Sequence, residues 1–408
     1  MYRAMVSRRS GAALAVPPYS FRVLQLSCLE EEMNLTARID ALLLFFEKRV
    51  GRACSAILVA TVLLVLAHVY VAPAPGPVNH GNDFNQMSFD PFDFTPGFKV
   101  HNRILTSFVA HYAYKLPLFP YRDFILVINI IGVCFISLLY GAARREGLSP
   151  TSSLLAAAVL TFSAPVLFFI NYAGYTDITS YALVFLAMCT VRNNLVWPWM
   201  LALALLNHEN TFFSFPWFLL FYYLRNDRKV YRALGAVVLT GLSAVPWYLW
   251  VRYVASFQAP LYGVSYYASL GMVTTLRMVL EYLYVGFFQA FKLFWVIPAY
   301  AIVTHLRERN FLEASLYLLI VACACAQLCF AIDTSRLISA SFPVVWLGFL
   351  TLARRWNVVT FQRMIGHLFL LNLFVPEFYV GHDVLVRFYS RPVSWFLGWY
   401  FDMESWRH

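Results

Sequence analysis

The sequence predicts an all-α polytopic membrane protein with about eleven transmembrane helices, and three observations lead to this class. Hydrophobic residues make up 61% of the 408 residues and charged residues 13%, about half the charged share of a soluble protein. Apolar runs of about 18 or more residues recur from Ala53 onwards, and each can cross a bilayer. The net charge of +10 comes from short basic clusters between these runs. Such clusters indicate topology signals and contacts with anionic membrane lipid, and no nucleic-acid partner.

The apolar runs place the spans in order along the chain. The fourth to sixth runs are short, so these spans are expected to be tilted, re-entrant or longer than the run itself. We expect the spans at about 53–72, 124–141, 152–170, 178–191, 195–206, 211–224, 233–253, 283–303, 311–331, 337–352 and 364–380.

Basic residues orient these spans. If all the spans are real, the basic clusters lie on one side of the membrane, and the positive-inside rule makes that side cytoplasmic. The N-terminus is then inside, and we expect a bacterial inner membrane as the location. The clusters begin at Lys48, Arg144, Arg192, Arg225, Arg307 and Arg354.

The chain divides into three parts. Residues 1–32 are predicted to be either a poorly ordered cytoplasmic extension or the result of a start assigned too early, because the chain reads like a natural start from Met33. Residues 33–380 form a single transmembrane domain, and residues 381–408 an outward aromatic tail. The seven cysteines include no CxxC pair, so they predict buried thiols without a disulfide or a metal site.

The first outward loop, 73–123, is the longest and carries Asp83, Asp90 and Asp93. Aspartates at this position could act as a general base for a hydroxyl acceptor or as ligands for a divalent cation. The alternative is that Asp90 and Asp93 simply build turns. Apolar residues at helical spacing between Val100 and Leu116 predict an amphipathic helix at the membrane interface, with Arg103 on its rim.

Two further groups of polar residues follow the third and fifth spans. Tyr175 and Asp177 form a hydrogen-bonding surface that suits a sugar or a lipid headgroup, although Asp177 could simply cap the next helix. His208 and Glu209 could bind phosphate or a metal ion, or shuttle a proton. A zinc-protease helix would need a second histidine at Phe212, so that class is excluded. A plain polar turn is the remaining alternative, and the cost of charge at membrane depth argues against it.

The last group, Asp333 and Arg336, lies between the ninth and tenth spans. Three residues of spacing let the two side chains pair across one helical turn, which would explain both. Alternatively, Arg336 binds a lipid phosphate through two hydrogen bonds while Asp333 orients it. All of these groups fall on the outward face, whereas the opposite loops carry plain basic anchors.

This layout resembles the GT-C class of integral-membrane glycosyltransferases. The resemblance rests on the many spans, on Asp83, Asp90 and Asp93 in the first large outward loop, and on Arg103 in the following helix. It implies transfer of a sugar from a polyprenyl-phosphate donor, with one of the three aspartates deprotonating the acceptor hydroxyl. Arg103 and Arg336 would hold the lipid phosphate of this lipid-linked sugar donor.

Two other classes remain open. In a transporter or lipid-handling protein, Asp177, His208, Glu209 and Asp333 would line a translocation path, which favours ionisable residues deep within spans and an internal repeat. The expected spans contain few ionisable residues, mainly Lys292, and the sequence shows no internal repeat. A non-enzymatic assembly partner is the third class.

Overall fold

Helices form almost the whole of the structure, a computed structural model that describes residues 19–71, 76–77, 79–94, 100–117, 122–257, 271–331, 333–381 and 384–388. A single two-stranded hairpin near the C-terminus is the sheet structure within these ranges. The side chains of residues 19–34 and 377–388 are not among those described. The expected aromatic tail, 381–408, therefore lies outside the described residues except for Gly381 and one strand.

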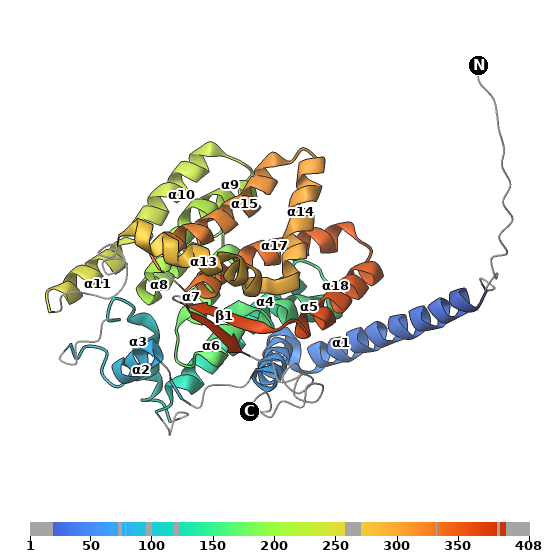
Figure 1. The fold of residues 1–408 in the computed structure, drawn as a ribbon, viewed down its shortest axis with the longest axis horizontal. Coiled ribbons are helices and arrows are strands. Elements are labelled where there is room, and N and C mark those ends of the chain that lie inside the picture. The colour runs from blue at the N-terminus through green and yellow to red at the C-terminus, as the bar shows by residue number, and fades with distance from the viewer. Residues whose placement is uncertain are drawn as a thin grey trace, which may run out of the picture.

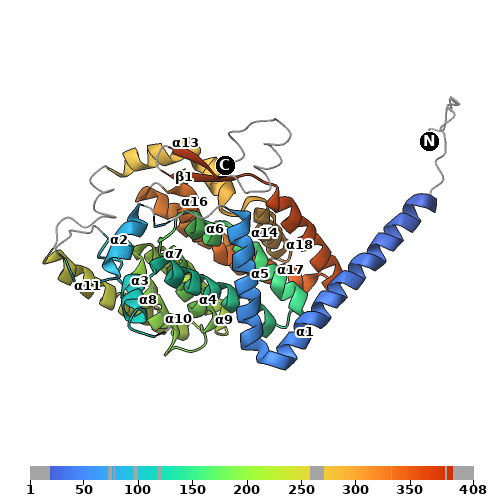
Figure 2. The ribbon, with the colours of Figure 1, turned by 90° about the horizontal axis from the view of Figure 1, so that it is seen from below.

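The first helix, α1 (Tyr19–Tyr70), consists of two arms joined at Gly51. Gly51 has a φ of 83°, a conformation that glycine adopts without steric cost, so the chain turns sharply there. The arm after Gly51 packs against α4 (Phe124–Arg145) and α5 (Pro150–Thr161). The earlier arm contacts the same two helices through Glu47 and Asp40, and its beginning extends away from the body of the molecule (Figures 1 and 2). The helix begins at Tyr19, inside the segment expected to be an extension or a misassigned start.

The segment between α1 and α4, which was expected to be the first outward loop, contains two short helices, α2 (His80–Met87) and α3 (Leu105–Ala113). The second lies within the helix expected at 100–116. Thr106, Ser107 and Ala110 face inwards, whereas Val109 and Tyr112 are exposed. This distribution, with small polar residues inside and apolar residues outside, is what a helix against lipid requires.

The rest of the chain continues as helices up to residue 373 (Figure 1). These elements are α6 (Ala164–Asn171), α7 (Asp177–Cys189), α8 (Trp197–Asn207), η1 (Glu209–Ser214), α9 (Phe215–Arg225), α10 (Val230–Ser243), α11 (Val245–Ala255), α13 (Met272–Phe291), η2 (Lys292–Trp295), α14 (Val296–Arg307), α15 (Phe311–Ala326), η3 (Gln327–Cys329), α16 (Thr334–Ser339), α17 (Phe342–Arg355) and α18 (Val358–Leu373).

Five helical segments in the described chain are long and apolar enough to cross a membrane, and a sixth results if α5 and α6, bent by 50°, are one broken span. These segments support membrane insertion and coincide with six of the expected spans. The other expected spans correspond to shorter helices, including α7, α8 and α18, so the count of eleven is not confirmed. The segments are Leu35–Tyr70, Phe124–Arg145, Val230–Ala255, Val273–Arg307, Phe311–Cys329 and the bent pair.

The last expected span, 364–380, differs from the structure. Helix α18 ends at Leu373, and β1 (Glu377–Gly381) pairs antiparallel with β2 (Val384–Phe388). Pro376 stops the helix because proline has no backbone donor and disfavours helical geometry in the residue before it. The aromatic and β-branched residues that follow favour a strand. The all-α class is confirmed, and this hairpin is a local addition at the end of the last expected span.

The break between α13 and η2 illustrates how polar groups are satisfied inside the apolar bundle. Lys292 has a positive φ of 49° and is almost fully buried. Its Nζ donates to the Val375 carbonyl, and the Leu293 N–H donates to Asn372 Oδ1 at 2.9 Å. These bonds replace those that the helix loses at the break. Lys292, the ionisable residue within the eighth expected span, thus fixes the segment just after α18 against the end of α13.

Candidate functional site

Four segments that are far apart in the sequence meet at one end of the bundle. They are the entry to α3, the α6–α7 junction, the α8–η1 junction and the start of α16. Each contributes ionisable or phenolic side chains, nearly all of them buried. We call this set the polar cluster: Arg103, Tyr175, Asp177, His208, Glu209, Asp333 and Arg336.

Arg103 and Glu209 form the most strongly bonded pair of the polar cluster. Arg103 Nε donates to Glu209 Oε2 at 2.9 Å and Nη2 donates to Oε1 at 2.5 Å. Asn102 adds a bond to Oε2 at 3.3 Å. Burial alone would raise the pKa of Glu209, but the Arg103 guanidinium lowers it to about 2. Burial alone would lower the pKa of Arg103, but the Glu209 charge and its hydrogen bonds outweigh this effect and raise the pKa above its ordinary value. Both groups therefore stay charged.

His208 lies between Glu209 and Asp177. Its Nδ1 accepts a hydrogen bond from the Asn210 N–H at 3.2 Å, which leaves Nε2 as the protonated nitrogen of a neutral ring. Nε2 is 3.8 Å from Asp177 Oδ1 and forms no hydrogen bond with any described residue. Burial, and then the charge of Arg103, lowers the pKa of His208 to about 4, so the ring is neutral near pH 7.

Arg336 occupies the centre of the other half of the cluster. Its Nη2 pairs with Asp333 Oδ2 at 2.9 Å, and its Nε lies 3.8 Å from Asp177 Oδ1. The guanidinium carbon lies 5.4 Å from the ring centroid of Tyr175 and 5.8 Å from that of Phe168. Carboxylates at the edge and aromatic rings nearby fix the plane of the group. Burial raises the pKa of Tyr175 to about 12, so its hydroxyl is a donor at neutral pH.

A small cavity of about 30 Å³ lies between these two halves. Asp177, His208 and Arg336 all line it, together with hydroxyl groups that include Ser180 and Thr211. Its volume suffices for a water molecule, and polar side chains line part of its otherwise apolar wall. A water-sized space beside an imidazole and a carboxylate is an arrangement that can support proton transfer.

Asn207 holds the backbone around the cluster. Its side chain is fully buried and donates to the Thr176 carbonyl and to Ser180 Oγ, both at 2.8 Å. It accepts a bond from Thr106 Oγ1, which also contacts Thr179. This network links α3, α7 and α8. The segments beside them that carry the charged groups therefore keep fixed positions relative to one another.

The loop aspartates lie in different surroundings. Asp83 in α2 pairs with His80, with 3.2 Å between Oδ2 and Nδ1, and 34% of its side chain is exposed. The His80 ring lies 6.3 Å from the ring of Tyr175 in an edge-to-face arrangement, which connects Asp83 to the polar cluster. Asp90 is exposed, and its Oδ1 accepts a bond from the Phe92 N–H. Asp93 is also exposed and lies in the same turn.

Two glycines allow α2 to approach the α6–α7 junction. A Cβ at Gly81 would overlap the Ala173 carbonyl, and a Cβ at Gly174 would lie 2.8 Å from Gly81 Cα. Gly174 also has a positive φ of 92°. Two backbones at this distance leave no room for a side chain, so both positions require glycine.

The structure thus brings Arg103, Tyr175, Asp177, His208, Glu209, Asp333 and Arg336 together, with Asp83 beside them and Asp90 and Asp93 apart. Arg103 was expected on the rim of an interfacial helix, but it lies buried before α3. The proposed cap role does not account for Asp177, because Thr176 occupies the N-cap position and Asp177 faces Arg336. The turn role of Asp90 and the local pairing of Asp333 with Arg336 are both present.

Sequence reasoning missed three contributors to this site: His80, Asn102 and Thr106. The spacing of His80 and Asp83, three residues apart at the start of a helix, is a signal that could have identified the first pair. Asn102 and Thr106 flank Arg103 on the inner side of the expected interfacial helix. No spacing rule links them to Glu209 or Asn207, about a hundred residues away.

No group of three or more histidine, cysteine, aspartate or glutamate side chains within the described residues has the arrangement of a metal site. The apolar helices and the buried ionic cluster define the class as a helical protein suited to a membrane, with a polar site at one end of the bundle. The chain matches no protein-family model, and no curated protein or solved structure is significantly similar to it.

Proposed function

We propose that this protein is a membrane glycosyltransferase that moves a sugar from a polyprenyl-phosphate donor to an acceptor hydroxyl. The observation that carries the proposal is the polar cluster itself. Two guanidinium groups, two carboxylates and an imidazole are buried together at the end of apolar helices, and the half-buried Asp333 lies beside them. Buried ion pairs seldom add stability compared with apolar packing, so retaining this set favours a functional role.

Asp83 is the best-placed base of the three loop aspartates. Its carboxylate is accessible and borders the cluster through His80 and Tyr175, whereas Asp90 builds a turn. Asp83 would take the proton of the acceptor hydroxyl, whose oxygen attacks the anomeric carbon of the sugar. The bond to the lipid phosphate breaks, and the phosphate leaves with the bonding electrons.

Arg336 is the group proposed to face that phosphate. It is held between Asp177 and Asp333 and oriented by Tyr175, so it is arranged in advance for the negative charge that develops on the leaving group. Arg103 is fully engaged by Glu209 and would act by positioning the α8–η1 junction. A divalent cation would be an additional phosphate ligand. The site would open on the outer side of a bacterial inner membrane, with eleven spans and a cytoplasmic N-terminus.

The test is transfer by the full chain in nanodiscs, supplied with a panel of radiolabelled polyprenyl-phosphate sugars. Asp83→Asn is expected to lower transfer by about 10²–10⁴-fold, the usual contribution of a general base. Asp227→Asn, an exposed carboxylate remote from the cluster, is the control. Loss of transfer in Asp90→Asn or Asp93→Asn instead would move the base to that residue. Absence of transfer from every donor would overturn the function.

A second candidate is a proton-coupled transporter or lipid-handling protein. The observation that favours it is the water-sized cavity between Asp177, His208 and Arg336, which suits a proton relay. This function predicts uptake or flipping of a labelled substrate in proteoliposomes with an imposed pH gradient. It also predicts that His208→Gln abolishes that movement, whereas sugar transfer would be undetectable.

A further inference from the structure

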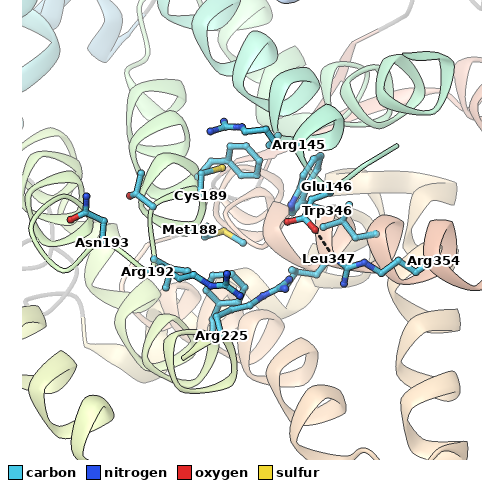
Figure 3. A pocket seen from close by; sticks show the side chains of 16 residues that line it. Arg145, Glu146, Met188, Cys189, Arg192, Asn193, Arg225, Trp346, Leu347 and Arg354 are labelled. Carbon is cyan, nitrogen blue, oxygen red and sulfur yellow. Dashed lines mark hydrogen bonds and ion pairs between the residues drawn. The ribbon is translucent and has the colours of Figure 1, made fainter. Parts of the chain in front are cut away.

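A second site lies at the opposite end of α7, away from the polar cluster. The ends of α4, α7, α9 and α17 surround a cavity of about 710 Å³. Figure 3 shows Arg145, Arg192, Arg225 and Arg354 around it, contributed by four of the basic clusters that were expected to act as topology signals and surface contacts with anionic lipid. A volume of this size is in the range of small-molecule sites.

The charge of this basic pocket is unbalanced. Glu146 is the one carboxylate of its lining, and it pairs with Arg354 (Figure 3). Within the described residues, no ion pair joins Arg145, Arg192 or Arg225 to a carboxylate; Arg225 lies over the Phe221 ring, with its guanidinium carbon 5.4 Å from the ring centroid. Four arginines against one glutamate leave an excess of three positive charges. The polar cluster has the opposite balance, with three carboxylates around two arginines.

The inner wall of the basic pocket is apolar. Phe185, Met188, Trp346 and Leu347 line it between the arginines. A ligand that satisfies both surfaces carries a concentrated negative charge and an uncharged portion that packs against these side chains. Guanidinium groups bind phosphate oxygens in pairs of hydrogen bonds, which makes phosphate the anion that best fits several converging arginines.

We propose that the basic pocket binds a phosphate-bearing anion, with the arginines on the phosphate oxygens and the apolar wall against the remainder of the ligand. The ligand is either the headgroup of an anionic membrane lipid or a soluble phosphate compound, since both present the same chemistry. The site is independent of sugar transfer, because no residue of the polar cluster lines it.

The experiment compares two probes on the full chain in nanodiscs. Phosphatidylglycerol in a phosphatidylcholine background is scored as lipid retained in native mass spectrometry, and inorganic pyrophosphate is titrated by calorimetry. The pocket variant is Arg192→Gln with Arg225→Gln. The matched control is Arg307→Gln with Arg309→Gln, which removes the same charge from exposed positions outside the pocket. Arg145→Gln, a single change at an exposed position, is a second pocket variant that perturbs folding less.

Each lost guanidinium contact is expected to lower affinity about tenfold or more. Loss of phosphatidylglycerol in the pocket variants, with the control unchanged, supports a lipid ligand. Loss of pyrophosphate binding in the same pattern supports a soluble one. Equal losses in the pocket and control variants would show diffuse attraction to anions and overturn the proposal, and so would failure of the unaltered protein to bind either probe.

Discussion

Arg103 and Glu209 form a buried two-point ion pair, with 2.9 Å from Nε to Oε2 and 2.5 Å from Nη2 to Oε1, although 106 residues separate them. The pair joins the segment before α3 to the α8–η1 junction. It therefore fixes the segment between α1 and α4 against the elements that carry His208 and Asp177.

Arg103→Ala is expected to lower the free energy of unfolding by about 3–5 kcal/mol, because it leaves the Glu209 carboxylate buried without its partner. Arg355→Ala, which breaks an exposed pair with Glu308, should cost much less, because water already screens that pair. Denaturant unfolding in detergent followed by tryptophan fluorescence measures both. Equal losses would contradict the role assigned to the buried pair. Arg103→Met combined with Glu209→Leu should recover part of the loss, since neither charge is then left alone.

The pH dependence of stability should reveal His208. Its pKa is lowered to about 4 from about 6.5, so between these values the unfolded chain binds a proton that the folded chain does not. The free energy of unfolding therefore falls as the pH decreases from about 6.5 to 4. Glu209, whose pKa is lowered from 4.5 to about 2, adds a further loss below about pH 4.5.

His208→Gln should remove the contribution of His208 to the loss of stability between about pH 6.5 and 4.5, and it should leave the loss at lower pH. Tm values measured from pH 4 to pH 8 in the same detergent provide the comparison. His111→Gln, at an exposed turn of α3, is the control for a general histidine effect. An unchanged pH profile in His208→Gln would mean that the ring is not held neutral by its surroundings.

Arg336→Lys tests whether the shape of the guanidinium group matters. Lysine keeps the charge but cannot contact Asp333 and Asp177 from one rigid plane or stack on Tyr175 in the same way. If the protein transfers sugar, we expect the KM for the lipid donor to rise about tenfold or more. Arg277→Lys, at an exposed position of α13, should change neither KM nor kcat. If Arg336→Lys changes neither KM nor kcat, the phosphate contact must be assigned to another residue.

Gly174→Ala should separate α2 from the α6–α7 junction. The added Cβ would lie 2.8 Å from Gly81 Cα, and alanine disfavours the positive φ at this position. A loss of about 1–3 kcal/mol in stability is expected, together with faster proteolysis between α1 and α4. Gly141→Ala is the control, because the space around that glycine is open. Unchanged proteolysis of Gly174→Ala would contradict the close approach.

Local sequence patterns predict some of these features and cannot predict others. Asp333 and Arg336 pair as their spacing within one helical turn suggests, and the helix containing Thr106 follows from its periodicity. The cost of charge near lipid directed attention to the groups that the structure brings together in the polar cluster. Which of them touch depends on tertiary packing: nothing near Arg103 in the sequence indicates Glu209 as its partner.

The span count shows a second limit of the sequence. A hydropathy window does not distinguish a helix long enough to cross a membrane from a shorter apolar helix such as α7 or α8. Likewise, the apolar residues after Leu373 extended the last expected span past Pro376. The basic pocket was hidden because four arginines were interpreted separately, each beside its own helix end.

Helix α7 connects the polar cluster to the basic pocket with 13 residues, from Asp177 to Cys189. At 1.5 Å per residue this helix is roughly 20 Å long, whereas the hydrocarbon layer of a bilayer is about 30 Å thick. In a membrane, at least one of the two ionic sites must then lie below the level of the lipid headgroups. At α7 the protein would then be thinner than the bilayer, with a water-filled recess on one or both sides. A phosphate bound in such a recess would lie up to about 10 Å nearer the centre of the bilayer than the headgroups around it.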